Sequence, residues 1–335
     1  MNLTRRATLS LIAAAAIARP ARAAETIRLG LLKTLSPAPF YIAQEAGYFA
    51  GEGVQVEFKF FQAAQPIAAA AVAGDIDVGV TALTGGFFSL AGKGALKVIG
   101  GALHEQKGFD LTAILVSRKA YDAGLTSVEK LPGHSFGITQ YGSSFHYMIG
   151  RIAETAGFDL KSITLRPLQD IGNMMAAVRS GAVDATMAIA SQAKPAEASG
   201  DAKIIGWVGD RIPYQITALF AAKPALARPD ALHRFARAYQ KGVADYRAAF
   251  LRFEGPKPVR SPATETAIAA IRKYVFTADA DGPEKILAGI GWYDEAAALD
   301  TADVAAQLAW FQAQGLVKDP IQAADIIEPG YFPIR

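Results

Sequence analysis

HSFGITQYGSSFHYMIGR, residues 134–151, is the stretch that decides the predicted fold. It begins as a short β-prone run, continues through the turn Gly142-Ser143-Ser144, and becomes a helix at Phe145. A helix that starts directly after a strand points its first N–H groups, and the positive end of its dipole, out of the strand's carboxyl end. This turn is therefore a predicted seat for a small anion or a carbonyl group. Taken alone, the stretch is equally compatible with an ordinary turn of an α/β protein.

The first 23 residues differ in character from the rest of the chain. Arg5 and Arg6 precede an apolar run over residues 9–18, and Ala21-Arg22-Ala23 has the spacing of a cleavage signal. The apolar run is too short for a bilayer span, which needs about 20 residues. We therefore predict an export peptide that is cleaved after Ala23, and its paired arginines resemble a twin-arginine signal.

Composition and charge exclude several classes of function. The formal net charge is +3, but the predicted export peptide carries four arginines and no acid, so the mature chain carries −1. Without a basic cluster, nucleic-acid binding has little support. The chain contains no cysteine, which excludes disulfides, thiolate metal sites and cysteine nucleophiles. Its four histidines lack metal-ligand spacing, so neither a metal nor a cofactor is predicted.

In the mature chain, strand patterns alternate with helix patterns. Residues 26–32, 54–61 and 76–81 are predicted strands, and the segments between them have helical character. This alternation is typical of a parallel sheet. Ligands bind such sheets where the strands end, which selects residues 36–41 and 81–86.

A second α/β unit follows, built around residues 134–151. The two units share the order helix, Gly-x-x-Asp, strand, once at Gly74 and Asp77 and again at Gly181 and Asp184. Such a glycine is also an ordinary helix C-cap and such an aspartate an ordinary turn residue. Either interpretation predicts two similarly built lobes.

Beyond a predicted strand at residues 214–222, helical spacing dominates. Three helices are predicted, at residues 229–250, 262–274 and 301–314, and we expect them to pack on the first lobe. The aromatic stripes of this tail are predicted to be core: Phe235, Tyr239, Tyr246, Phe250, Trp310 and Phe311.

Five segments together carry a resemblance to a known family. They are SPAPFYIAQEAGYFAGEGVQVEF (36–58), AGDIDVGVTA (73–82), VEKLPGHSFGITQYGSSFHY (128–147), SGAVDATMAI (180–189) and QAQGLVKDPI (312–321). In this order they resemble the periplasmic solute-binding proteins of ABC importers. The branch is the one for aliphatic sulfonates, nitrate, taurine and thiamine-pyrimidine precursors.

The resemblance implies a two-lobed α/β fold of the type II periplasmic binding proteins. Each lobe would be a mainly parallel sheet flanked by helices, with the ligand in the cleft between the lobes. Residues 24–112 and 215–335 would form lobe 1, and residues 113–214 would form lobe 2. Crossing strands near residues 110–115 and 214–220 would join the lobes and bend as a hinge.

The resemblance also implies ligand-binding positions at the strand ends of both lobes. Relatives often show Trp-x-Pro where this chain has Ala190-Ser191-Gln192, so no particular ligand is transferred. Lys33 is the only Lys or Arg on these loops, which favours a monoanion or a neutral ring over a doubly charged anion. The expected ligand-binding residues are Ser36, Phe40, Tyr41, Thr81, Thr84, Gln140, Tyr141, Gly142, Ser143, Ser144, His146, Asp170, Asn173, Ser191 and Gln192.

The implied function is transport rather than catalysis. The protein would capture a small organic anion or ring compound in the periplasm, of sulfonate, aromatic carboxylate or pyrimidine type. It would then deliver this ligand to the permease and ATPase of an ABC importer in the inner membrane. Two alternatives stay open. One is a pyrimidine-synthesis-type enzyme on the same fold, disfavoured because the cysteine-rich iron motif is absent. The other is a ligand sensor that presents its closed form to a membrane receptor.

Overall fold

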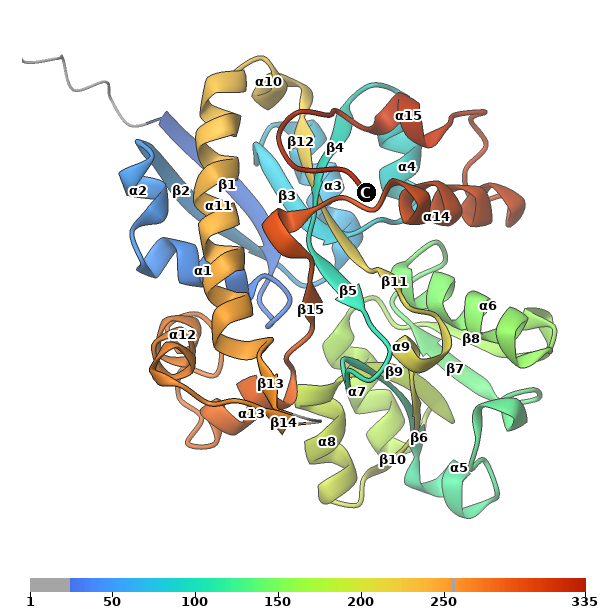
Figure 1. Cartoon of the computed structure of the whole chain (residues 1–335). Coiled ribbons are helices and arrows are strands. Elements are labelled where there is room, and N and C mark those ends of the chain that lie inside the picture. The colour runs from blue at the N-terminus through green and yellow to red at the C-terminus, as the bar shows by residue number, and fades with distance from the viewer. Residues whose placement is uncertain (1–24, 255–256) are drawn as a thin grey trace, which may run out of the picture.

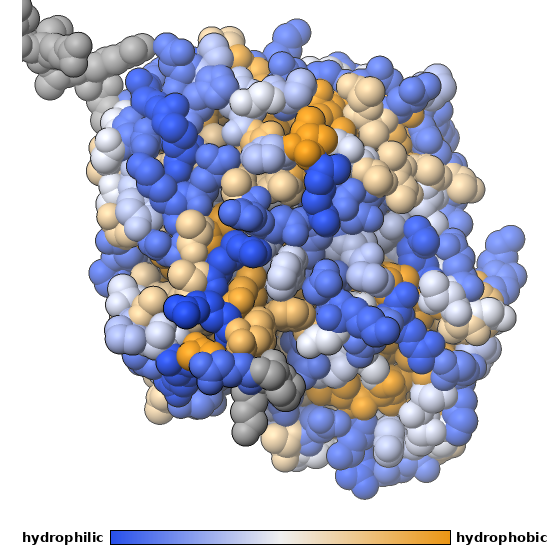
Figure 2. Space-filling model, in the orientation of Figure 1, coloured by the Kyte–Doolittle hydropathy of each residue, from blue (hydrophilic) through white to orange (hydrophobic). Residues whose placement is uncertain are grey.

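The computed structural model describes residues 25–254 and 257–335, so the predicted export peptide lies outside the described residues. Two five-stranded sheets flanked by helices form two lobes that lie side by side (Figure 1). None of the helices in this part of the chain combines the length and apolar character that a membrane crossing requires. On the face shown in Figure 2, hydrophilic residues surround small hydrophobic groups, as is usual for a surface in water.

The sheet of lobe 1 has the strand order β2-β1-β3-β12-β4. Its strands are β1 (Glu25–Leu32), β2 (Val54–Phe61), β3 (Val78–Ala82), β4 (Leu96–Gly101) and β12 (Thr217–Ala222). β12 runs antiparallel to both of its neighbours, and the other strands share one direction. The predicted strands of the first unit are therefore present, in a mainly parallel sheet.

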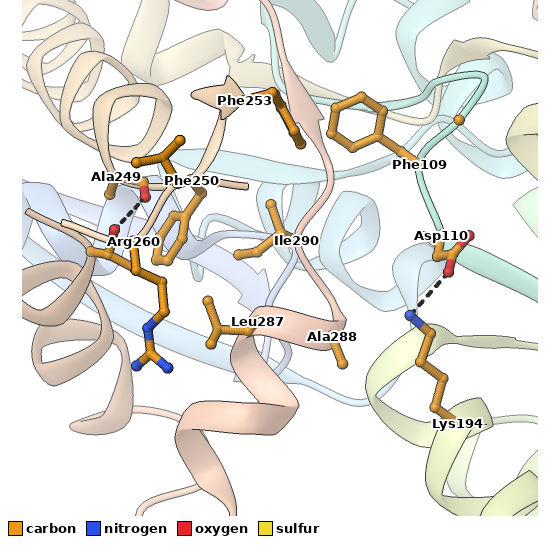
Figure 3. Close-up of a pocket in the computed structure, with 13 residues that line it drawn as sticks. Phe109, Asp110, Lys194, Ala249, Phe250, Phe253, Arg260, Leu287, Ala288 and Ile290 are labelled. Atoms are coloured by element: carbon orange, nitrogen blue, oxygen red, sulfur yellow. Dashed lines mark hydrogen bonds and ion pairs between the residues drawn. The ribbon is translucent and has the colours of Figure 1, made fainter. Parts of the chain in front are cut away.

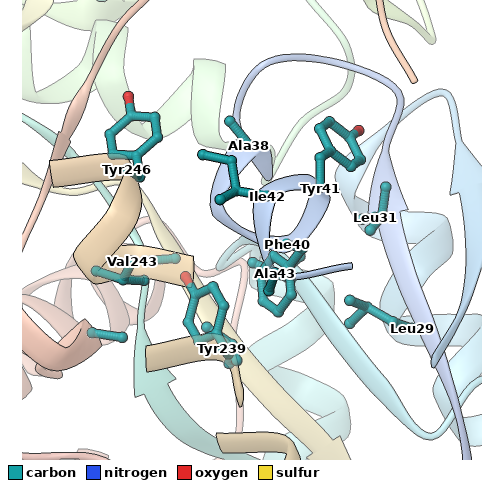
Figure 4. Packing of buried hydrophobic residues seen from close by; sticks show 14 of the residues in the cluster. Leu29, Leu31, Ala38, Phe40, Tyr41, Ile42, Ala43, Tyr239, Val243 and Tyr246 are labelled. Atoms are coloured by element: carbon teal, nitrogen blue, oxygen red, sulfur yellow. The ribbon is translucent and has the colours of Figure 1, made fainter. Parts of the chain in front are cut away.

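Helices of lobe 1 come from both ends of the chain. The long helix α11 lies along α1, and Phe40 of α1 stacks on Tyr239 of α11 with ring centroids 3.9 Å apart (Figure 4). The aromatic stripes of the tail are buried, as predicted. The helices are α1 (Ala38–Glu45), α2 (Tyr48–Gly51), α3 (Ala64–Ala73), α4 (Gly85–Gly92), α10 (Lys223–Leu226), α11 (Pro229–Phe250), α12 (Pro262–Arg272), α13 (Gly282–Ala288), α14 (Thr301–Ala313) and α15 (Ala323–Ile326).

The sheet of lobe 2 has the order β10-β6-β9-β7-β8, and again one strand, β6, opposes the direction of the rest. The strands are β6 (Thr112–Ser117), β7 (Ser135–Ile138), β8 (Thr164–Pro167), β9 (Ala185–Ile189) and β10 (Ala202–Trp207). The helices are α5 (Arg118–Asp122), α6 (Ser144–Ala156), α7 (Ile171–Ser180), α8 (Ala190–Ala198) and α9 (Val208–Arg211). Residues 134–151 thus form β7, a turn and α6, as predicted.

A third, antiparallel sheet joins the lobes. It consists of β11 (Tyr214–Gln215), β5 (Leu103–Glu105) and β15 (Trp292–Tyr293), in that order. The sequence placed the first crossing at residues 110–115, but residues 112–115 begin β6, whose six side chains are all buried in the lobe 2 sheet. The second crossing segment is β11, which begins at Tyr214 as expected. Ile216, which belongs to neither strand, separates β11 from β12. A short hairpin of β13 (Phe253–Glu254) and β14 (Lys257–Pro258) lies beside this region.

The repeated Gly-x-x-Asp has the same structural role in both lobes. In each lobe the glycine ends a helix in the left-handed conformation, which favours glycine. The aspartate then fixes the first strand of the unit to the third. A carboxylate oxygen of Asp77 accepts the backbone N–H of Arg28 at 2.8 Å, and one of Asp184 accepts that of Ser135, also at 2.8 Å.

Removal of the Asp77 carboxylate is expected to destabilise the protein. Burial alone raises the pKa of Asp77, but hydrogen bonds from Arg28 and the charge of Arg228 outweigh burial and lower this pKa. Asp77→Ala should therefore reduce the free energy of unfolding by about 1.5–3 kcal/mol, the range for hydrogen bonds to a charged group. Urea denaturation at pH 7 measures this loss.

The matched control is Asp75→Ala, because Asp75 lies exposed in the same turn. An equal loss in both variants would contradict the role given to Asp77. The difference between them should also shrink in acid, because a lowered carboxyl pKa contributes stability only above that pKa.

Candidate functional site

A cavity of about 80 Å³ lies between the lobes, at the ends of strands from both sheets. We call it the inner cavity. Leu32 of β1 and Leu103 of β5 line one side, and Phe145 and Met148 of α6 line the other. The remaining apolar wall includes Ile189 at the end of β9. The site is thus built from both lobes, at the strand ends that the sequence selected.

The polar groups of the inner cavity are all hydroxyls. No Asp, Glu, Lys, Arg or His is among the described residues that line it. The wall therefore offers hydrogen bonds without a formal charge. The hydroxyl residues are Thr34, Ser36, Thr81, Thr112, Thr139, Ser144 and Thr217.

Thr81 has the most informative hydroxyl of this set. Its side chain is 3% exposed, and its Oγ1 has no hydrogen-bond partner among the described residues. A buried hydroxyl without a partner costs free energy, so native proteins seldom keep one without a reason. A molecule bound in the inner cavity can supply this missing partner.

Three helices begin at the wall of the inner cavity. Ala64, Ser144 and Ile171 are the first residues of α3, α6 and α7, and all three line the cavity. Each helix N-terminus carries partial positive charge and N–H groups without intrahelical partners. Together they can stabilise an electron-rich group that has no cationic side chain beside it.

The lobes touch directly across the cleft. The backbone N–H of Gly85, at the start of α4, donates to the carbonyl oxygen of Gly142 at 2.9 Å. The side chain of Gln140 donates to that of Gln65. Trp310 of α14 donates through Nε1 to Glu154 of α6 at 3.0 Å. These residues therefore join the lobes across the cleft and do not line the inner cavity.

The structure brings five of the expected binding residues to cavities between the lobes. Ser36, Thr81 and Ser144 line the inner cavity. Ser191 and Gln192 line a second cavity that adjoins it. Sequence reasoning missed Thr34 after β1, the threonines of β6 and β12, and Thr139 after β7. The only sequence feature that could have identified these residues is a hydroxyl side chain at a strand end or in a crossing segment.

Two expected aromatic residues lie elsewhere, which corrects our sequence interpretation. Phe40 is fully buried against α11, and Tyr41 stacks on Tyr274 with ring centroids 4.6 Å apart. The Tyr41 hydroxyl donates to the carbonyl oxygen of Thr34 at 3.2 Å. Neither ring lines the inner cavity, because α1 turns this face toward the core of lobe 1. Tyr41 instead supports the backbone of a residue that does line it.

Several expected binding residues are helix caps. Thr84 accepts the N–H of Phe87 at 3.0 Å, Ser143 accepts that of His146 at 3.3 Å, and Asp170 accepts that of Asn173 at 2.7 Å. The Asn173 side chain donates back to Asp170 and to the preceding loop. These groups have protein partners and do not line either cavity. Tyr141 is 56% exposed, with its ring edge against His146.

A further cavity of about 270 Å³ lies beside α11 and α13 (Figure 3). Phe250 and Phe253 form part of its wall, and Lys194 pairs with Asp110 at 3.0 Å across one side. Its charged groups are thus already paired with protein groups. It is a weaker candidate for ligand binding than the cavities between the strand ends.

Residues 35–249, more than half of the chain, match the family described as NMT1/THI5 like. The chain belongs to this family. The match confirms the resemblance seen in the sequence, since the family and the structural neighbours reported below include the branch that the resemblance named. No curated protein matches the chain.

Several solved structures with similar folds are solute-binding proteins. The alkanesulfonate-binding protein SsuA from Xanthomonas axonopodis pv. citri, bound to MOPS, matches with a TM-score of 0.71 at 19% identity, over 91% of this chain and 98% of that chain. The periplasmic aliphatic sulphonate binding protein SsuA from Escherichia coli matches with a TM-score of 0.66 at 19% identity, over 91% and 92%.

A third match, the CA3427 gene product of Candida albicans, is described as having the generic periplasmic binding protein fold. Its TM-score is 0.65 at 16% identity, over 92% of this chain and 97% of that chain. At such identities the likeness shows the fold alone. It confirms the predicted fold class, the two-lobed α/β fold of periplasmic binding proteins.

His146 is expected to make stability depend on pH. Burial lowers the pKa of His146 to about 4, and its Nδ1 accepts the N–H of Gly142 at 3.1 Å, so the ring is neutral at pH 7. Unfolding restores the ordinary pKa of 6.5, so the unfolded state binds more protons between pH 6.5 and 4. Stability should therefore fall as the pH is lowered through this window, by on the order of 3 kcal/mol from this residue, since one pKa unit corresponds to about 1.4 kcal/mol.

Denaturation of the His146→Gln variant over this pH range tests the effect. The variant should show a shallower loss than the wild type. His233→Gln is the matched control, because His233 is exposed. Equal slopes in all three proteins would show that His146 does not contribute.

Proposed function

We propose that this protein is the extracytoplasmic solute-binding component of an ABC importer. It captures a small organic anion or ring compound between its lobes and delivers it to a membrane permease and its ATPase. The observation that carries the proposal is the inner cavity, which both lobes enclose and which offers hydroxyls and apolar surface without a charged side chain. Support comes from the family and from the SsuA proteins, whose descriptions name sulfonate ligands.

The wall of the inner cavity narrows the ligand class. A doubly charged anion needs cationic partners, because burial of an unpaired charge is costly. Helix N-termini and hydroxyls instead suit a single negative charge or the polar edge of a ring. Apolar residues of both lobes suit the ligand's body. Sulfonates, aromatic carboxylates and pyrimidines fit this description.

The same wall favours binding over catalysis. Nucleophilic catalysis by a hydroxyl needs an adjacent base, and acid–base catalysis needs a group that titrates near neutral pH. The described lining residues supply hydroxyls but neither of these. The pyrimidine-synthesis-type enzyme is therefore the weaker proposal. A sensor that presents the closed form to a receptor requires the same cavity. Capture of the membrane partner distinguishes the two roles, because a sensor binds a receptor and a transport component binds a permease.

We further propose that the protein acts in the periplasm, after export directed by residues 1–23. The sequence pattern of these residues supports export. The Escherichia coli SsuA is described as periplasmic, which agrees with this location.

Obstruction of the inner cavity is expected to abolish ligand binding. Ala64 lies in the cavity wall at the start of α3, and Ala64→Trp should fill the space. The protein is expressed from the full-length chain and screened by thermal shift. A ligand should be found among alkanesulfonates, aromatic carboxylates and pyrimidines. A ligand at 100 times its Kd stabilises the wild type by about 2.7 kcal/mol, and the variant should lose this shift.

Ala69→Trp provides the matched control, because Ala69 is exposed on the same helix. It should retain the ligand-induced shift. The proposed function is contradicted if no compound in the panel stabilises the wild type, and the cavity assignment is contradicted if Ala64→Trp still responds.

A further inference from the structure

A second cavity adjoins the inner cavity, and we call it the outer cavity. It has a volume of about 270 Å³ and shares Thr34 and Ile189 with the wall of the inner cavity. The loop after β1, the start of α8, and residues 274–279 between α12 and α13 enclose it. It is therefore also built by both lobes, and it lies next to the inner cavity.

The outer cavity contains polar atoms that lack protein partners. Ser191 is 3% exposed, and its Oγ has no hydrogen-bond partner among the described residues. The side-chain oxygen of Gln192 is likewise buried and without a partner. Rotation of this amide by half a turn presents its NH₂ group instead. Two neighbouring side chains thus offer unused hydrogen-bonding capacity to this space.

The outer cavity also contains a cation that has no acidic partner among the described residues. Lys33 lines it and forms no ion pair with any described residue. The one acid in its lining, Asp279, is already paired with Lys285 at 2.6 Å. Thr277 and Ala278 of the wall are exposed to solvent, which reduces the cost of holding a charge there. A full negative charge is therefore better placed in the outer cavity than in the inner one.

We propose that the outer cavity binds the oxyanion head group of an elongated ligand, a sulfonate or carboxylate, whose uncharged body occupies the inner cavity. This inference rests on the proposed function and specifies its ligand class. The ammonium group of Lys33 and the hydroxyl of Ser191 donate to the head group, and Gln192 completes the set. The apolar wall of the inner cavity selects the body.

Pairs of nearly isosteric compounds test this division. Benzenesulfonate and benzenesulfonamide differ mainly in charge, as do benzoate and benzamide. Isothermal titration should show that Lys33→Gln weakens benzenesulfonate or benzoate binding about tenfold, while the uncharged partner changes less than about twofold. The affinity of the wild type for the anion should also fall as the salt concentration rises. The preferred pair tells whether a sulfonate or a carboxylate is bound.

Matched variants make the result specific. Lys59→Gln removes an exposed lysine that does not line the outer cavity, and it should leave all affinities unchanged. Ser191→Ala should weaken both members of a pair severalfold, whereas Ser199→Ala, at an exposed site after the same helix, should not.

The outcomes separate this inference from the proposed function. If the wild type binds a pair and Ala64→Trp abolishes binding, but Lys33→Gln affects the anion no more than its neutral partner, the proposed function stands and the outer-cavity inference fails. If the wild type binds none of the four compounds, the outer-cavity inference fails as well. In that case the broader panel of ligands decides on the proposed function alone.

Discussion

The antiparallel pairing of β5 with β11 is the constraint on which the rest of the structure depends. At this pair the chain passes from one lobe to the other and back, with Tyr214 opposite Glu105. β15 from the tail pairs with the other edge of β5 and brings Nε2 of His104 to 3.0 Å from a carboxylate oxygen of Asp294. The residue that opens β5, Leu103, also lines the inner cavity. The backbone segment that connects the lobes therefore also forms part of the wall of the inner cavity.

Much of the fold could be predicted because it depends on local patterns. Residues 134–151 form a strand, a capped turn and a helix, since a β-prone run, a Gly/Ser turn and an amphipathic segment each favour one conformation. The crossing strands could not be placed in this way. Residues 110–115 have a good strand pattern, but whether they join a lobe sheet or the connecting sheet depends on distant partners. Pairing with β9 and β10 places residues 112–115 in lobe 2.

The site was harder to predict because one residue type has two roles. Ser143 and Ser144 are neighbours, yet Ser143 caps α6 and Ser144 lines the inner cavity. Sequence cannot separate a capping hydroxyl from a ligand-binding one, since both stand at helix starts. Phe40 and Tyr41 followed a strand end, as ligand-binding aromatics do. Only the packing of α11 on α1, which brings residues about 200 positions apart into contact, shows that they are core.

The contact between Gly85 and Gly142 has a consequence for how such a protein can change its cargo. It joins backbone to backbone, and a Cβ on Gly85 would lie 3.7 Å from the Cα of Gly142. Its strength is thus independent of the side chains that surround the ligand. Under the proposed function, substitutions among the cavity hydroxyls alter which molecule is held without changing this contact. The groups that select a ligand and the groups that join the lobes here are thus separate parts of the chain.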